Sequence, residues 1–158
     1  MNKIITSDEA IKVSQNSDVT FLTGSFDLLH IGHMQFLHAA KDIDVSSKLI
    51  VAVLGDEQIK RRKGKDRPYA SESFRIEALS YLEAVDSILL WAKPWEELRE
   101  FITELKPKYF VITDDDSAIE NKRQHIEKIG GELKVITKKT DISTTKLLQS
   151  ISNGEKIH

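Results

Sequence analysis

Cysteine is absent from this chain, and proline and glycine are scarce, with three and seven residues respectively. Without cysteine the chain has no disulfide and no thiolate metal site, and a reducing compartment fits this absence. No apolar run approaches the about 18 residues of a membrane span, and the first residues lack the apolar core of a signal peptide. We therefore expect a cytoplasmic protein that does not enter a membrane.

The chain also has no large excess of positive or negative charge. The 23 basic residues are balanced by 25 acidic ones, which gives a formal net charge of −2 at pH 7. A generic nucleic-acid-binding protein would be basic overall, so we expect no nucleic-acid partner. The length and composition are typical of one globular domain. We place this domain over residues 1–158, with an N-terminal helix in 1–17, a core over 18–152 and a tail over 153–158.

Short apolar runs alternate with helical patterns along the chain. The predicted strands are residues 19–23, 49–54, 87–91, 109–113 and 133–137. The predicted helices are residues 7–15, 31–41, 72–82, 95–105, 118–129 and 144–151. The strands show little polar alternation, as expected for strands that are buried on both faces. The alternation of strands with helices along the chain predicts an α/β fold. We expect a Rossmann-like doubly wound sheet of five parallel strands with helices on both faces.

The segment after the first predicted strand holds the most specific signal. Gly24 begins a turn, and His30 and His33 then open the predicted helix 31–41, with Gly32 between them. Backbone N–H groups at a helix N-terminus favour an anionic ligand, and the glycine allows close approach to the backbone. Metal ligation by the two histidines is a competing interpretation for which no third ligand is obvious. We expect a phosphate-binding corner here.

A basic run follows the second predicted strand, and its position suggests a role at the same edge of the sheet. Residues 60–67 contain six cations and one acid, Asp66, in a chain that is otherwise acidic. Such a run indicates either a solvated loop or a mobile lid over a polyanion. As a lid, its lysine would neutralise charge that develops during phosphoryl or nucleotidyl transfer.

Acidic residues follow the fourth predicted strand. For Asp116 we expect helix capping, and for Asp114 or Asp115 a position facing the ligand. The two tryptophans, Trp91 and Trp95, are expected to pack rather than to stack on a base.

Hydroxyl residues precede the last predicted helix. Ser143, Thr144 and Thr145 either cap this helix or hold a second edge of the same phosphate. Because parallel strands end at one edge of the sheet, this segment should lie close to the histidine corner.

Together these segments resemble a known superfamily. Residues 24–33 (GSFDLLHIGH) are similar to the His-x-Gly-His signature of nucleotidylyltransferases, and residues 142–146 (ISTTK) resemble their second signature. Residues 62–68 (RKGKDRP) are similar to the lysine-bearing loop of these enzymes, and residues 72–86 to the helix that follows it. The resemblance extends over about residues 18–152.

The resemblance implies an activity and a set of partners. Such enzymes join a nucleoside triphosphate, here ATP or CTP, to a phosphorylated alcohol or sugar and release pyrophosphate, usually with Mg²⁺. The acceptor phosphate itself attacks the α-phosphorus, so no covalent nucleophile is required. The resemblance also suggests a homodimer.

The resemblance further implies roles for individual residues. The catalytic residues would be His30, His33 and Lys63. The nucleotide-binding residues would be Thr23, Gly24, Ser25, Phe26, Gly32, Asp114, Asp115, Ile142, Ser143, Thr144 and Thr145. The acceptor-binding residues would be Asp27, Lys41, Arg62 and Arg75, although Asp27 can instead brace its turn by hydrogen bonding. No protein ligand for a metal is assigned.

The motifs do not all resemble the same subfamily. Residues 63–68, 82–86 and 105–107 resemble the adenylyltransferase domain that activates heptose 1-phosphate in lipopolysaccharide precursor synthesis, which is the branch we favour. Trp95 and residues 111–115 are more similar to glycerol-phosphate and choline-phosphate cytidylyltransferases.

Two departures from these patterns leave room for two further functions. Thr113 stands where the adenylyltransferases carry glycine, and residues 138–141 lack the arginine and glycine of the cytidylyltransferases. The first of these functions is that of an FAD synthetase-like adenylyltransferase, and the second is that of a nucleotide-binding regulator without turnover.

Overall fold

The computed structural model describes residues 2–157, so Met1 and His158, the two ends of the predicted domain, lie outside the described residues. Its single sheet is parallel throughout, with the strand order β1-β4-β3-β2-β5-β6. The strands are β1 (Ile4–Ile5), β2 (Val19–Gly24), β3 (Lys48–Leu54), β4 (Ser87–Trp91), β5 (Tyr109–Thr113) and β6 (Glu132–Ile136). The predicted α/β class is confirmed, but the sheet has six strands and not five.

The additional strand, β1, escapes sequence patterns because it is only two residues long. Ile4 and Ile5 pair with Ile88 and Leu89 of β4 and extend the sheet at its edge. A two-residue strand shows neither the apolar run nor the alternation by which longer strands are recognised.

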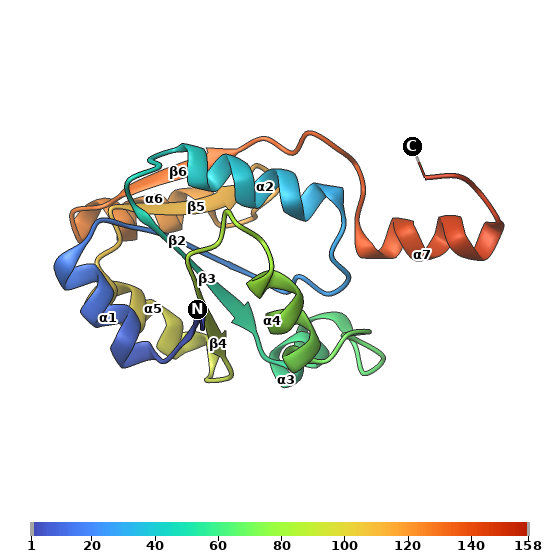
Figure 1. Ribbon diagram of the computed structural model, residues 1–158, viewed down its shortest axis with the longest axis horizontal. Helices are drawn as coiled ribbons and strands as arrows, with labels where there is room; N and C mark the ends of the chain where they lie inside the picture. The colour runs from blue at the N-terminus through green and yellow to red at the C-terminus, as the bar shows by residue number, and fades with distance from the viewer. Residues whose placement is uncertain (1, 158) are drawn as a thin grey trace.

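Helices cover both faces of the sheet (Figure 1). They are α1 (Ser7–Asn16), α2 (Ile31–Asp42), α3 (Asp56–Lys63), α4 (Glu72–Ser80), α5 (Trp95–Leu105), α6 (Ile119–Lys128) and α7 (Thr144–Asn153). Apolar residues of α1, α5 and α6 form one core with the strands, and those of α2 and α4 form a second core on the opposite face. Figure 1 shows α7 at one end of the molecule, apart from the sheet. Within residues 2–157 no helix is long and apolar enough to cross a membrane.

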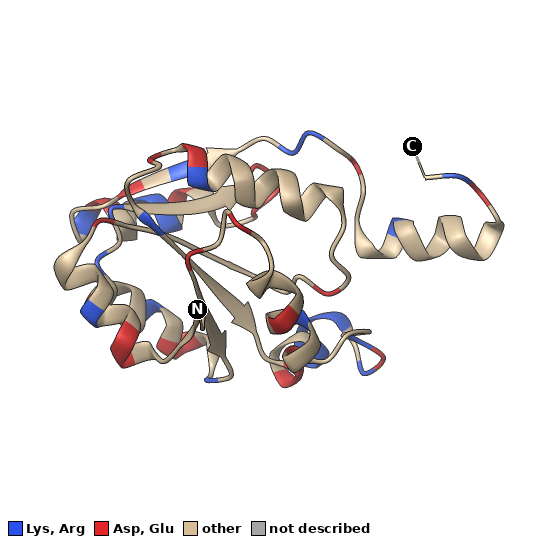
Figure 2. Ribbon diagram, in the orientation of Figure 1, with Lys and Arg blue, Asp and Glu red and all other residues tan. Residues whose placement is uncertain are grey.

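Helix α3 corrects the expectation of a loop over residues 60–67. Asp56 and Glu57 lie in its first turn, and four basic residues end it at Lys63, which is the charge distribution that a helix dipole favours. Ile59 is fully buried and anchors the helix to the core. Figure 2 shows the basic residues of α3 and of the loop after it gathered at one end of the molecule. Lys63 therefore projects from a helix end and not from a mobile loop.

The strand register brings the polar segments to one edge of the sheet, as predicted. Gly24 at the end of β2 is opposite Val53 of β3, and Thr113 at the end of β5 is opposite Ile136 of β6. The histidine corner, the acidic run and the segment before α7 follow directly from these strand ends.

A buried arginine ties α4 to the turn after β2. The Arg75 side chain is fully buried, and its guanidinium donates to the carbonyl oxygens of Ala70 at 3.0 Å and Ser25 at 2.5 Å. Its Nη2 atom also donates to Asp56 Oδ1 at 2.8 Å, so Arg75 forms an ion pair with the first residue of α3. A single side chain thus fixes three segments that surround the end of β2.

We expect Arg75→Met to lower the free energy of unfolding by about 3 kcal/mol, because it leaves three hydrogen-bond acceptors in or near the protein interior without a donor. Arg75→Lys should recover only part of this loss, since an ammonium lacks the forked geometry of guanidinium. Urea unfolding followed by circular dichroism measures both effects.

The matched control is Arg61→Met on the exposed side of α3, which should change stability by less than about 0.5 kcal/mol. A change of that small size for Arg75→Met would contradict the structural role of Arg75.

Candidate active site

Two adjoining cavities lie at the carboxyl edge of the sheet. The first, of about 500 Å³, lies between the N-terminal part of α2 and the segment that joins β6 to α7. The second, of about 760 Å³, extends along the ends of β2 and β5 toward α3 and α5. Residues that line both cavities mark their junction; they are His33, Phe36, Lys63, Thr113, Lys138 and Thr144.

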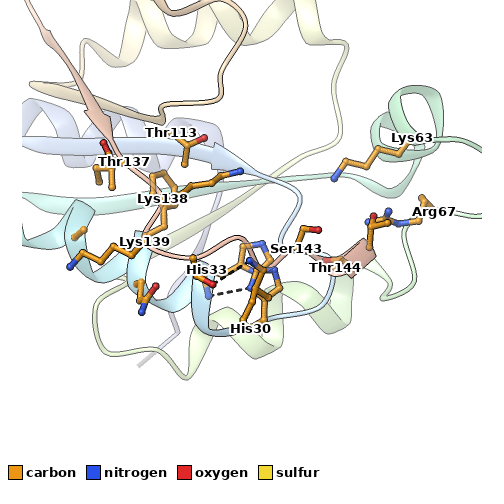
Figure 3. A pocket seen from close by; sticks show the side chains of 18 residues that line it. His30, His33, Lys63, Arg67, Thr113, Thr137, Lys138, Lys139, Ser143 and Thr144 are labelled. Carbon is orange, nitrogen blue, oxygen red and sulfur yellow. Dashed lines mark hydrogen bonds between the residues drawn. The ribbon is translucent and has the colours of Figure 1, made fainter. Parts of the chain in front are cut away.

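Two stacked histidines lie at this junction: His33 lines both cavities, and His30 beside it lines the first (Figure 3). His30 caps the N-terminus of α2, and its Nδ1 atom accepts a hydrogen bond from the Gly32 N–H at 3.2 Å. The His30 and His33 rings stack with centroids 3.9 Å apart, and Phe26 packs against His33 at 5.3 Å. Because Nδ1 of His30 is an acceptor, the proton of the neutral ring lies on Nε2 and is free to be donated.

The surroundings hold both imidazoles in the neutral form. Burial, followed by the nearby His30 and Lys63, lowers the pKa of His33 to about 4. Burial and the charge of Lys138 also lower the pKa of His30. At neutral pH the pair therefore offers N–H donors without carrying positive charge.

Two lysines supply positive charge from opposite walls of the cavity. Figure 3 shows Lys63, from the end of α3, and Lys138, which follows β6, with their ammonium ends directed toward one another above the histidines. Lys138 forms an ion pair with Asp115, which also accepts a hydrogen bond from Thr113 at 2.6 Å. Reduced solvation and the charges of Arg67 and Arg62 lower the pKa of Lys63.

The N-terminus of α7 closes the first cavity. Ser143 caps the helix, with its Oγ atom accepting from the Lys146 N–H at 3.2 Å. Ile142, Ser143, Thr144 and Thr145 all line the cavity, as predicted from their position before the last helix. Backbone N–H groups at a helix start and adjacent hydroxyls are suited to phosphate oxygens.

The acidic run divides between structural and cavity-facing positions. Asp114 accepts a hydrogen bond from the Lys138 backbone N–H at 3.3 Å, and Asp115 lines the second cavity. The helix capping expected of Asp116 is wrong, because Ala118 is the N-cap of α6 and no side chain in the described part of the chain caps this helix. Asp116 instead accepts from the Ala118 N–H at 2.9 Å just before α6 and pairs with Lys122.

The residues expected to bind the acceptor are only partly brought together. Arg62 lines the second cavity, where its guanidinium lies 5.4 Å from the Trp95 ring centroid. Asp27 also lines it, but its buried carboxylate is already bonded to Arg67 and to two backbone N–H groups.

Two of those residues do not reach either cavity. Lys41 lies near the amino ends of the strands, where it donates to Asp86 at 2.7 Å and to the Ser47 carbonyl oxygen at 2.8 Å. Arg75 is buried behind the site, with its donors engaged as described above. Each of the two side chains is held by partners within the fold. Both residues therefore stabilise the structure around the site and do not line it.

Three residues of the site were not in the predicted set. Lys138 and Arg67 line the first cavity, and Trp95, expected to pack, is 42% exposed and lines the second. Trp91 is buried as expected. The position of Lys138 directly after a predicted strand was the available signal for it, and Trp95 likewise stands at a strand-to-helix connection.

No metal-binding cluster is present in the part of the chain that the structure describes: no three His, Asp or Glu side chains come together. The carboxylates that line the second cavity, Asp27, Asp115 and Asp116, are each paired with a cation. This donor set does not fit a divalent cation held by the protein alone, because such ions require several free oxygen ligands.

Comparison with known proteins agrees with this geometry. A family model described as cytidylyltransferase-like matches residues 21–153. The bifunctional proteins HldE of Yersinia pestis (strain Pestoides F) and Yersinia pseudotuberculosis (serotype O:1b) are each 37% identical over 139 residues. The match covers 86% of this chain but 28% of those proteins, so the chain spans less than a third of their length.

Two solved structures share the fold. The lipopolysaccharide core biosynthesis protein of Thermoplasma volcanium is 26% identical, with a TM-score of 0.63 over 80% of this chain and 100% of that one. Pantoate-beta-alanine ligase of Francisella tularensis, 12% identical with a TM-score of 0.63 over 98% of this chain and 77% of that one, shows the fold alone. Because the family model matches most of the chain, and both predicted signatures fall within it, the chain belongs to the cytidylyltransferase-like family.

Proposed function

We propose that this chain is a nucleotidyltransferase that transfers the nucleoside monophosphate of ATP to a sugar 1-phosphate and releases pyrophosphate. The observation that carries the proposal is the junction of the two cavities, where a neutral imidazole pair lies between two lysines. Neutral donors and cations that meet at one point are suited to a phosphorus centre that gains charge during transfer.

The nucleotide would lie across the junction of the two cavities. Its nucleoside would lie in the second cavity, against the turn after β2 that contains Ser25 and Phe26. Its phosphates would lie in the first cavity against the N-terminus of α7, with the α-phosphorus at the histidine pair. The acceptor would enter the second cavity beside Arg62 and Trp95. An acceptor phosphate oxygen would then attack the α-phosphorus as the bond to the β-phosphate breaks, and pyrophosphate would leave with that electron pair.

The protein's contribution would be positioning and charge stabilisation. His30 and His33 would donate N–H groups to the α-phosphate oxygens, and Lys63 and Lys138 would neutralise the phosphates from opposite sides. Mg²⁺ would enter as part of the nucleotide substrate, coordinated by phosphate oxygens and water, because the carboxylates that line the second cavity are already paired.

The choice of a sugar phosphate as acceptor rests on similarity. The motifs resemble the heptose 1-phosphate adenylyltransferase domain, and the similar proteins include HldE proteins and a lipopolysaccharide core biosynthesis protein. A cytidylyltransferase that uses CTP and glycerol 3-phosphate is the second candidate, favoured by the exposed Trp95 beside the second cavity.

Pyrophosphate release with each combination of nucleotide and acceptor tests the proposal. ATP and CTP should each be combined, with Mg²⁺, with heptose 1-phosphate, glycerol 3-phosphate and FMN. We expect release with ATP and heptose 1-phosphate. Release with CTP and glycerol 3-phosphate alone would favour the second candidate, whereas nucleotide binding without release in any combination would contradict an enzymatic function.

We expect His33→Gln to lower turnover about 100-fold while changing the dissociation constant for ATP by less than about threefold. The reason is that its N–H group would act mainly on charge that appears in the transition state. Steady-state kinetics and calorimetry measure the two quantities. His38→Gln, on the exposed side of the same helix, is the matched control. Equal losses in turnover and affinity would contradict this role for His33.

Nucleotide binding should leave the His33 ring neutral at pH 8. The folded protein holds His33 neutral with a pKa of about 4, and an adjacent triphosphate raises this pKa from that low starting value. His33 should therefore take up no proton when ATP binds at pH 8, and it should donate its N–H group without carrying charge.

Calorimetry in two buffers of different ionisation enthalpy counts the protons taken up on binding. His30, Lys63 and Lys138 also face the phosphates, so the contribution of His33 is the difference between the wild type and His33→Gln. We expect equal proton uptake by the two proteins at pH 8, and a larger uptake by the wild type would contradict a neutral His33 in the complex.

A further inference from the structure

Of the three lysines that line the first cavity, Lys138 has a counterion, whereas Lys63 and Lys139 have none among residues 2–157. Lys60, in the same helix as Lys63, pairs with Glu57 at 2.6 Å, and Lys138 pairs with Asp115. The nearest acid, Asp27, is already engaged: it accepts from Arg67 Nε at 2.8 Å and from the N–H groups of Tyr69 and Ala70. The amine of Lys63 is therefore held beside positive charge without a carboxylate partner.

The surroundings also increase the fraction of this amine that is in the uncharged, nucleophilic form. The ammonium is directed into the cavity (Figure 3), and reduced solvation together with Arg67 and Arg62 lowers its pKa. The opposite holds for Lys60, one turn earlier in α3, whose hydrogen bond to Glu57 raises its pKa. A free amine is the reactive form of lysine toward acyl carbon.

The same cavity offers a place for a phosphate group next to this amine. The histidine pair, Lys138 and the N-terminus of α7 face Lys63 across the junction. A small molecule that carries a phosphate on a reactive carbonyl would be held with its carbonyl carbon near Lys63 Nζ, and such positioning accelerates reaction.

We propose that Lys63 is an acylation site for acyl phosphates, the mixed anhydrides of a carboxylic acid and phosphoric acid. The Lys63 nitrogen attacks the carbonyl carbon and forms an amide bond, and the bond between that carbon and the phosphate oxygen breaks. Inorganic phosphate leaves with the electron pair and takes the proton that the amine loses. No oxidant or reductant takes part.

Acylation would inactivate the site that we propose for nucleotidyl transfer. The amide has no positive charge and adds bulk at the junction of the two cavities, so Lys63 could no longer neutralise phosphate. This regulatory consequence rests on the proposed function, but the acylation itself does not, because it requires only the amine and the anion site.

Acetyl phosphate at neutral pH is the probe, and peptide mass spectrometry follows the acetylated fraction of each lysine with time. We expect Lys63 to react at least about tenfold faster than Lys60, the matched lysine of the same helix. Inorganic phosphate should protect Lys63 and leave Lys60 unaffected, because phosphate would compete with acetyl phosphate for the anion site.

A neutral acetyl ester of N-hydroxysuccinimide separates recruitment by phosphate from the reactivity of the amine alone. The ratio of Lys63 to Lys60 labelling should be higher with acetyl phosphate than with this ester, and Lys138→Met should lower it only for acetyl phosphate. Equal ratios with the two reagents, equal rates at the two lysines, or no protection by inorganic phosphate would each overturn the proposal. Labelling is read by mass, so the result stands even if no pyrophosphate is released in the transfer assay.

Discussion

The buried carboxylate of Asp27 is the interaction on which the site depends. Only 3% of the residue is exposed, and it accepts hydrogen bonds from Arg67 and from the N–H groups of Tyr69 and Ala70. These bonds join the turn after β2 to the loop after α3, two segments about 40 positions apart in the sequence. A carboxylate that is buried at this depth is stable only because its partners satisfy it. Its removal would separate the turn after β2, which lines the second cavity, from the loop that contains Arg67, which lines the first.

The engagement of Asp27 also decides the charge of the site. Since this carboxylate is used by Arg67, it is not available to neutralise Lys63, and Asp115 is likewise used by Lys138. Arg67 and Lys138 are thus paired with acids, whereas Arg62, Lys63 and Lys139, which also line the cavities, form no ion pair among residues 2–157. The site has this excess of positive charge in a chain with a net charge of −2. An anionic ligand is the partner that this local imbalance favours.

The sequence predicted the fold and much of the site because both follow from local patterns. Each of the predicted strands ends within one residue of an observed strand end, so the segments at the carboxyl edge were placed together correctly. The basic run was misinterpreted as a loop, because its dense charge conceals the single buried contact of Ile59 that makes α3 a helix. Arg75 and Lys41 bind partners that are distant in sequence, and no local sequence pattern indicates these contacts.

The neutrality of the histidine pair explains why the site combines two kinds of donor. A triphosphate is already highly charged before reaction, so fixed cations bind the substrate and the pyrophosphate product alike. Imidazoles that stay uncharged, as the low pKa of His33 ensures, contribute less to ground-state binding and more as charge grows on the α-phosphate oxygens. Burial against Phe26 and the stacked His30 is therefore part of the chemistry that we propose: it holds the donors neutral until the transition state requires them.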